Sequence, residues 1–420
     1  TTIHKTGRYY TLEICKTCKC SNLSHCNWCL CLFCIIIMNK KLVIQVRRRF
    51  KEQFKTKPLV LFSPGRINLI GEHTDYNDGF AFPAAINKGI VLAISKSDSK
   101  ESCVFAFNKN EIHKFETKHI KPLKNGGWRN YILGVVAELG VLGMEVESFN
   151  AVFAGDIPGG AGMSSSAALE NSFVYGLNKL FDLGLSKHDM ILVSQKAEHN
   201  FVGVKCGIMD QYASMFGIKK SALLLDCRTI ESQPYKIDFK DYKLMLINTN
   251  VKHDLSESEY NDRREVCEKV SGLLHLDALR DASKEDIDRI KNDISDGDYQ
   301  KALYVINENN RVKQFSEAIK NGDIKALGNL LYQSHEGLST KYKVSCKELD
   351  FLVDRAKENP NVIGSRMMGG GFGGCTINLV KKDAFKTFKK EVSKKFKAAF
   401  EYDCDVYSVK LSRGTQIIKK

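Results

Sequence analysis

Six side chains able to hydrogen-bond are concentrated in residues 64–79, between turn-forming glycines. This polar segment reads Pro-Gly-Arg-Ile-Asn-Leu-Ile-Gly-Glu-His-Thr-Asp-Tyr-Asn-Asp-Gly and follows a short apolar run at 58–62. The six are Arg66, Asn68, Glu72, His73, Asp75 and Asn77. Hydroxyl groups need donors and acceptors at fixed angles, and a buried hydroxyl without a partner is costly. We therefore expect a polyhydroxylated ligand here; the alternative is an ordinary polar surface loop.

Residues 158–170 combine glycines and serines in a pattern typical of an anion-binding loop. They read Pro-Gly-Gly-Ala-Gly-Met-Ser-Ser-Ser-Ala-Ala-Leu-Glu, and we call 158–166 the serine loop. Glycines let a backbone approach a ligand closely, and a helix N-terminus attracts anions. The helix expected after the serines has apolar residues on one face: Leu169, Phe173, Leu177 and Leu180. A phosphate is the expected ligand, although the lysine of a P-loop is missing; an ordinary serine cap is the alternative.

A third segment, residues 369–375, reads Gly-Gly-Gly-Phe-Gly-Gly-Cys, and we call 369–374 the glycine loop. It formally contains the Gly-x-Gly-x-x-Gly pattern of dinucleotide-binding folds. That pattern requires a helix directly after the glycines, whereas residues 375–380 predict a strand. We expect instead a tight loop that lies against a ligand or another loop; the alternative is a strained turn between strands.

Two carboxylates in the middle of the chain are further candidates. Asp210 lies in Gly-Ile-Met-Asp-Gln (207–211) among apolar neighbours, and a carboxylate in such a setting is either salt-bridged or functional. Glu198 lies on a predicted helix that begins at Ser186, where Asp189 completes a capping box. Taken alone, Glu198 is expected to be exposed or paired.

The elements that must position these residues mix helices and strands without a regular order. We expect strands at 59–62, 89–95, 104–107, 114–115, 149–154, 223–226, 243–248 and 375–380. We expect helices at 43–54, 128–142, 256–274, 284–294, 298–319, 323–337 and 346–358, and a basic helix after 380. Polar residues 231–241 make a reasonable domain boundary. The pattern predicts an α+β protein rather than a doubly wound parallel sheet.

Composition and charge narrow the class of protein. The chain has 420 residues, enough for two domains or one large one, with 43% hydrophobic and 27% charged residues. Most of its net charge of +14 belongs to residues 1–57, whose balance is +10, and the basic stretch at 381–397 has the apolar spacing of an amphipathic helix. We therefore expect no nucleic-acid partner. No run of eighteen apolar residues occurs, so we also expect no membrane association and a cytoplasmic protein.

The fourteen cysteines fall into two groups. Seven are scattered, as free thiols of a reducing compartment are. The other seven crowd into residues 15–34, where two Cys-x2-Cys pairs could bind zinc, although the gap between the pairs is short. Because Met38 opens a plausible natural start, we interpret residues 1–37 as a cysteine-rich extension that is disordered or not native. Its deletion is expected to leave activity unchanged.

Together these motifs resemble the sugar-1-kinase branch of the GHMP small-molecule kinases, and the galactokinases most closely. The likeness runs from about Ser63 to the C-terminus. It also includes Ser-Glu-Tyr at 258–260, the arginines at 263–264, Ser-His-Glu at 334–336 and Gly-Ser-Arg-Met-Met at 364–368. The resemblance implies a two-domain α+β fold with the active site between the domains. The N-terminal half (38–238) would resemble ribosomal protein S5 domain 2, and the C-terminal half (239–420) would be ferredoxin-like.

The resemblance also implies a reaction, the transfer of the γ-phosphoryl group of ATP to the anomeric hydroxyl of D-galactose. Asp210 matches the family's candidate base, and Arg66 matches the residue that orients it. The matches to sugar-binding residues are Glu72, His73, Asp75, Gly207 and Tyr260. The matches to the ATP site are Gly159, Gly160, Gly162, Ser164, Ser165 and Ser166, with Trp128 and Tyr131 near the adenine. Ser165, or its neighbour, and Glu198 match the Mg²⁺ ligands.

Two other functions fit part of this pattern. A related kinase acting on N-acetylgalactosamine or another sugar shares the motifs, because the size of the pocket beside the C2 substituent is not readable from sequence. A galactose-binding sensor without activity is the second alternative. Such relatives tend to lose residues from the serine loop, whereas residues 164–168, Arg66 and Asp210 are all present. We therefore favour the kinase and expect a monomer that binds galactose and ATP.

Overall fold

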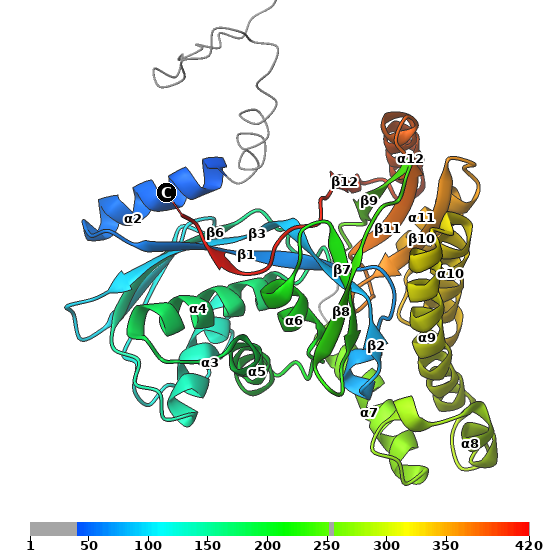
Figure 1. The fold of residues 1–420 in the computed structure, drawn as a ribbon, viewed down its shortest axis with the longest axis horizontal. Coiled ribbons are helices and arrows are strands. Elements are labelled where there is room, and N and C mark those ends of the chain that lie inside the picture. Colours follow the sequence, from blue (N-terminus) through cyan, green and yellow to red (C-terminus); the bar gives the residue numbers. More distant parts are fainter. Residues whose placement is uncertain (1–39, 252–255, 420) are drawn as a thin grey trace, which may run out of the picture. The chain divides into compact units, whose positions relative to one another are not determined.

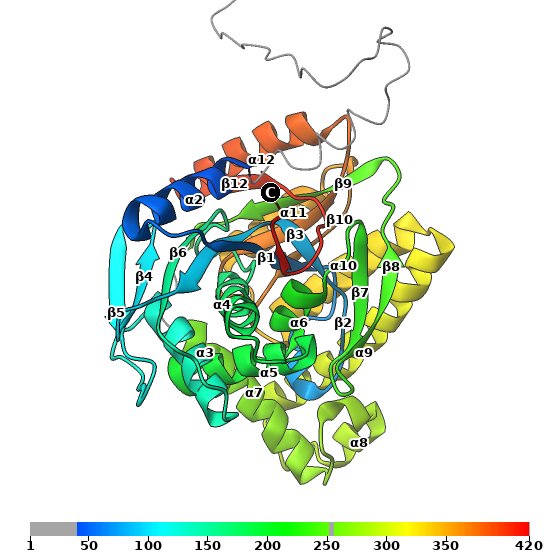
Figure 2. The ribbon, with the colours of Figure 1, turned by 60° about the vertical axis from the view of Figure 1, so that its left-hand side comes forward.

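A six-stranded sheet carries the start of the polar segment. The computed structural model describes residues 40–251 and 256–419, and residues 42–420 form one unit, separate from 1–41. The predictions for residues 1–37, including the zinc site, lie outside the described residues. The strand order is β13-β1-β3-β6-β4-β5, and every pair is antiparallel except β4 and β6 (Figure 1, and Figure 2 for β4 and β5). The strands are β1 (Leu59–Asn68), β3 (Pro83–Lys96), β4 (Ser102–Ala106), β5 (Glu111–Phe115), β6 (Phe149–Gly155) and β13 (Gln416–Ile417).

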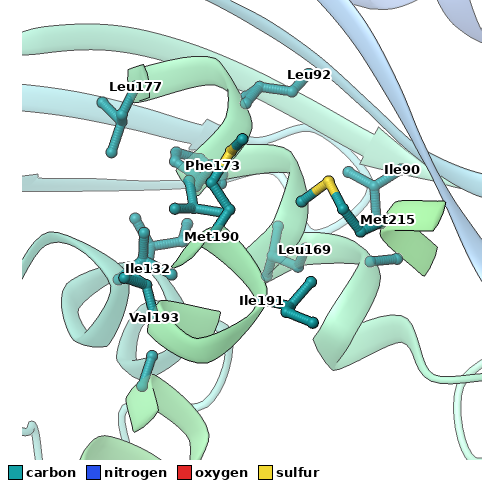
Figure 3. Close-up of a cluster of buried hydrophobic side chains, with 14 of the residues drawn as sticks. Ile90, Leu92, Ile132, Leu169, Phe173, Leu177, Met190, Ile191, Val193 and Met215 are labelled. Carbon is teal, nitrogen blue, oxygen red and sulfur yellow. The ribbon is translucent and has the colours of Figure 1, made fainter. Parts of the chain in front are cut away.

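Helices cover both faces of this sheet. On one face α2 (Lys40–Phe54) buries Val46 and Phe50 completely against strand residues. The other face is covered by α3 (Trp128–Val141), α4 (Ser165–Phe181) and α6 (Met209–Phe216), and α5 (Lys187–Ala197) packs on these helices (Figure 1). Figure 3 shows three of the apolar residues predicted on α4, together with their neighbours in this core: Leu169, Phe173, Leu177, Ile90, Leu92 and Met190. Their burial holds the serine loop in place, because α4 begins at its end.

A second sheet has the order β10-β11-β9-β12 and is antiparallel throughout. Its strands are β9 (Tyr242–Asn248), β10 (Val362–Met368), β11 (Cys375–Lys381) and β12 (Asp405–Ser408). The helices that pack with it are α9 (Asp296–Asn321), α10 (Ile324–Glu336), α11 (Lys347–Lys357) and α12 (Phe385–Phe400). The basic helix predicted after 380 is α12, which buries Phe388, Val392 and Phe396. The glycine loop connects β10 to β11.

The polar stretch 231–241 contains a strand that we did not predict. Residues 231–236 form β8 (Glu231–Lys236), which pairs with β7 (Ser221–Asp226) in a three-stranded sheet completed by β2 (Phe80–Ala81). Both strands lie between α6 and α9 (Figure 1, Figure 2). Because β8 is an edge strand, its polar residues and Pro234 are tolerated there. The boundary we placed between 238 and 239 falls between β8 and β9 and stays a prediction.

The remaining helices are α7 (Ser256–Leu273) and α8 (Lys284–Arg289). The latter ends at Arg289, short of the predicted 294. The Ser295 side chain accepts the N–H of Asp298 and begins α9 at Asp296, earlier than expected. With helices and strands mixed around three sheets, the α+β prediction is confirmed. No helix among the described residues has both the length and the apolar content needed to cross a bilayer.

Candidate active site

The polar segment, the glycine loop and α6 line a common cavity of about 230 Å³. This volume is below the roughly 300–1,000 Å³ of pockets for drug-sized ligands, so it suits a single small ring. The lining residues are Arg66, Glu72, His73, Asp75, Glu198, Val204, Cys206, Met209, Asp210, Tyr260 and Gly369–Phe372. Both predicted catalytic residues and four of the five predicted sugar-binding residues are therefore together.

Arg66 and Asp210 form a bidentate ion pair at this cavity. Nε of Arg66 donates to Oδ1 of Asp210 at 2.7 Å, and Nη2 donates to Oδ2 at 2.9 Å. Such a pair fixes the plane of the carboxylate as well as its position. β1 supplies Arg66 where its pairing with β3 shifts register, and α6 presents Asp210 in its first turn. Burial alone would lower the pKa of the Arg66 guanidinium, but Asp210, Glu72 and Asp75 outweigh that effect and raise it, so the side chain stays charged.

The serine loop contacts this ion pair. Arg66 Nη1 donates to the carbonyl of Gly162, and the Ser164 hydroxyl donates to Oδ2 of Asp210. Ser164 has a φ of 52° and does not cap α4 with its side chain, so the ordinary serine cap is not formed. No acidic residue lies in the first turn of α4. The N-terminus of this helix therefore has neither a side-chain cap nor a fixed negative charge, and it is suited to an anion.

The glycine loop packs directly on the serine loop, which agrees with our expectation of a tight loop that lies against a ligand or another loop. A Cβ added at Gly162 would lie 2.9 Å from the carbonyl oxygen of Met368, and one at Gly369 would lie 3.3 Å from Cα of Gly162. Gly162 and Gly369 have φ values of 64° and 88°, which favour glycine. The strand β11 follows the loop, so the helix that a dinucleotide-binding pattern needs is not there.

Glu72 is held by an arginine to which the sequence analysis gave no role. Arg366 of β10 is completely buried, and its Nη2 donates to Oε1 of Glu72 at 3.0 Å. The N–H of Gly369 donates to the same oxygen at 2.9 Å. The other hydrogen bonds of Arg366 go to three backbone carbonyls: Asn68, Leu69 and Met367. An arginine inside an apolar strand signals a buried partner, but the sequence does not say which one.

Asp75 and Gly207 are in direct contact. Asp75 is 8% exposed, and its Oδ1 accepts the N–H of Tyr76 at 3.1 Å. Burial, together with the charges of Asp210 and Glu72, raises the pKa of Asp75 to about 7. A Cβ added at Gly207 would lie only 2.3 Å from Cγ and Oδ2 of Asp75. Gly207 therefore makes room for Asp75.

Glu198, which we expected to be exposed or paired, is buried and hydrogen-bonded. It begins the π-helical turn η2 (Glu198–Val202) directly after α5. Burial and the charge of Asp210 raise the pKa of Glu198 to about 7, and a hydrogen bond with the Ser166 side chain offsets part of the rise. Nε2 of Gln211 donates to its Oε2 at 3.0 Å. Because the hydrogen bond that offsets the rise comes from Ser166, Ser166 is the serine beside Glu198, and Ser165 is exposed.

His73 lies among aromatic rings. Its ring centroid is 5.4 Å from that of Tyr260 and 4.9 Å from that of Tyr342, and its Nδ1 lies 2.8 Å from the Tyr76 hydroxyl. Burial and the nearby charge of Arg263 lower the pKa of His73 to about 3, so the ring is neutral. Its Nε2 has no hydrogen-bond partner within the described residues. A neutral ring nitrogen at the cavity can serve a hydroxyl group as donor or acceptor.

The structure does not bring every predicted residue to the cavity lining. Trp128 is 9% exposed in the core beneath the first sheet, and its indole N–H donates to Glu111 at 2.8 Å. Tyr131 is partly buried against the same core. Gly159 and Gly160 are exposed in the serine loop. The lining also contains four side chains to which we gave no role: Val204, Cys206, Met209 and Phe372. The motif around Asp210 was the nearest signal for the first three, and the glycine loop was the signal for Phe372.

Known proteins share this architecture and these motifs. Residues 48–96 match the galactokinase galactose-binding signature, residues 130–218 the GHMP kinases N terminal domain, and residues 315–398 the GHMP kinases C terminal domain. A galactokinase of Thermotoga petrophila is 40% identical over 357 residues, which cover 85% of this chain and 99% of that protein. One of Thermosipho africanus is 41% identical with the same coverage. The crystal structure of Lactococcus lactis galactokinase complexed with galactose has a TM-score of 0.86 and 33% identity, covering 90% of this chain and 100% of that one.

Proposed function

This chain belongs to the galactokinase family of GHMP kinases, and we propose that Asp210 and Arg66 direct the anomeric hydroxyl of D-galactose to the γ-phosphorus of ATP in its cavity. The enzyme is a galactokinase-type kinase, which forms galactose 1-phosphate and ADP. The roles of Asp210 and Arg66 are inferred from their bidentate ion pair, which lies at the cavity and contacts the serine loop.

Glu72, His73 and Asp75 are proposed to hold the sugar hydroxyls. Arg366 and the Gly369 amide anchor one oxygen of Glu72, which leaves its other oxygen for a ligand. The neutral ring of His73 has Nε2 available. The Tyr260 ring, which packs against His73, offers an apolar surface of the kind that sugar C–H groups need. These contacts suit a monosaccharide, because each hydroxyl requires its own partner.

The transfer itself requires positioning and charge stabilisation more than covalent chemistry. Oδ1 of Asp210 accepts one hydrogen bond, from Arg66, and keeps a second lone pair, whereas Oδ2 accepts from both Arg66 and Ser164. The anomeric hydroxyl donates to Oδ1 and passes its proton to Asp210 as the bond from its oxygen to the γ-phosphorus forms. The bond between that phosphorus and the β–γ bridging oxygen breaks, and ADP leaves. Arg66 stays charged and stabilises the negative charge that develops.

The triphosphate is proposed to lie along the serine loop at the N-terminus of α4, with Glu198 and Ser166 as Mg²⁺ ligands. No cluster of three acidic, His or Cys side chains suited to a metal occurs among the described residues. Mg²⁺ commonly takes one or two carboxylates together with phosphate oxygens and water, and these two side chains offer oxygen donors of that kind. When bound, the ion neutralises phosphate charge. Trp128 and Tyr131, at the start of α3, remain the candidates for adenine contact.

The proposal also covers the cellular compartment, the oligomeric state and the partners of the enzyme. We place it in the cytoplasm as a monomer without nucleic-acid or membrane partners. The seven described cysteines are all free, which is usual for proteins of reducing compartments.

A coupled ATP assay across galactose, N-acetylgalactosamine and glucose tests the substrate, and we expect turnover with galactose. Asp210→Asn keeps the size of the side chain but cannot take the proton. Its kcat should fall by about 10²- to 10⁴-fold while the fold stays intact. Faster turnover of another sugar would change the assigned substrate, and near-normal kcat in the variant would remove Asp210 from its role.

A further inference from the structure

The glycine loop has one side chain larger than a hydrogen atom, and that side chain lines the cavity. Phe372 stands between Gly371 and Gly373. It is 8% exposed and shares the cavity lining with Arg66 and Asp210. The guanidinium carbon of Arg263 lies 5.4 Å from its ring centroid. Phe372 therefore lines the same cavity as the groups that are proposed to direct the transfer, and its ring packs beside Arg263.

Phe372 has a backbone conformation that bulky residues avoid. Its φ is 59°, in the left-handed region, where a bulky residue is a clear outlier. The loop uses positive φ at four further positions, and all four are glycines: Gly369, Gly371, Gly373 and Gly374. Glycine would adopt the conformation of Phe372 more easily, so the backbone does not explain the phenylalanine. Phe372 also belongs to the buried apolar cluster that contains Leu338 and Met367, so the strained conformation is kept either for packing in that cluster or for the cavity, and the variants below separate the two.

Water is the competing nucleophile in this cavity. A water oxygen could bond to the γ-phosphorus while the bond to the β–γ bridging oxygen breaks, which gives ADP and inorganic phosphate and passes one water proton to Asp210. The carboxylate of Asp210 can accept a hydrogen bond from water as readily as from a sugar hydroxyl. Gly369, Gly370 and Gly371 present only backbone to the cavity, so on this side the apolar surface comes from Phe372.

We propose that the ring of Phe372 excludes water from the reacting centre, so that the phosphoryl group goes to the sugar. This proposal rests on the proposed function. Closure of a phosphotransferase site against water is a general requirement, and a buried apolar ring meets it without adding a group that could itself react. In this role Phe372 acts on the choice of acceptor, and its loss should change the ratio of the two products.

The experiment measures ADP and galactose 1-phosphate in the same reaction, and ADP formation without sugar, for Phe372→Ala and Phe372→Leu. We expect the ratio of ADP to galactose 1-phosphate to be near one in the wild type and in Phe372→Leu, whose side chain is still apolar and branched. In Phe372→Ala the ratio and the sugar-free hydrolysis should both rise several-fold. Phe372→Gly, which accepts the positive φ, should behave like Phe372→Ala and serves if the alanine variant folds poorly.

Val305→Ala is the matched control, because Val305 is completely buried in the same apolar cluster and does not line the cavity. Its product ratio should stay near one. The proposal is overturned if removal of the Phe372 ring lowers both products equally, or if Val305→Ala raises the ratio as much. If the wild type forms no galactose 1-phosphate, the proposed function fails, and that result is visible before any variant is compared.

Discussion

The substitution Gly207→Ala tests the sugar site through a single added carbon. Gly207 touches Asp75 and lies three residues before Asp210. Its φ is outside the left-handed region, so alanine does not strain the backbone. We expect the protein to fold normally and to bind galactose poorly, because the new methyl group occupies the place of the Asp75 carboxyl.

The size of the effect follows from the geometry. The added Cβ would lie 2.3 Å from Cγ of Asp75, whereas ordinary contact begins at 3.4 Å. The carboxyl must therefore move by about 1 Å, and a displacement of that size at a reacting site can cost on the order of 100-fold in rate. We expect kcat/KM for galactose to fall about 100-fold, equivalent to about 2.7 kcal/mol of transition-state stabilisation.

Steady-state kinetics with each substrate varied in turn measures this loss. The KM for galactose should rise, and the KM for ATP should stay close to that of the wild type. Gly140→Ala in α3 is the control, since no atom lies within 4 Å of its added Cβ, and it should leave kcat unchanged and the helix slightly more stable. Asp75→Ala should reduce the cost of Gly207→Ala, so the two losses should not add. Fully additive losses, or a defect confined to ATP, would refute this reasoning.

Two further predictions concern buried charge. Asp75 has a pKa of about 7 in the folded protein, against an ordinary value of 3.8, so the folded state holds this proton more tightly than the unfolded state does. The ligand-free protein should therefore lose stability as pH rises toward neutrality. For this group the loss is at most about 1.4 kcal/mol per pH unit. Asp75→Asn should flatten the fall in melting temperature between about pH 4 and pH 7, the interval between the unfolded and folded pKa values, and an unchanged fall would contradict the assignment. Arg366→Met leaves Glu72 buried without its cation and should lower the free energy of unfolding in urea by about 3–5 kcal/mol. Adding Glu72→Gln should restore part of that loss; no recovery would show that the ion pair is not the cause.

Local pattern was enough for most helices and strands near the site. The apolar residues of α4 predicted its buried face, and Ser186 with Asp189 predicted the start of α5. The strand β8 escaped prediction because only Tyr235 among its six residues is buried, so its pairing with β7 decides its conformation. The start of α9 at Asp296 depends on the cap at Ser295, which lies three residues before Asp298, where we expected the helix to begin.

Residue types and their spacing were enough to identify the chemical groups of the site: one arginine and several carboxylates in glycine-rich segments, followed by a helix whose N-terminus suits an anion. Which of these groups meet depends on how the chain packs. Glu72 and Arg366 are 294 residues apart in the chain and 3.0 Å apart in space. Ser166 rather than Ser165 faces Glu198, and the acidity of Asp75 is set by burial beside Asp210 and Glu72. Electrostatic energy depends on the distance between the charges and on the exclusion of water from them. For residues far apart in the chain, short distances and dry surroundings exist only once the sheets and loops have packed together.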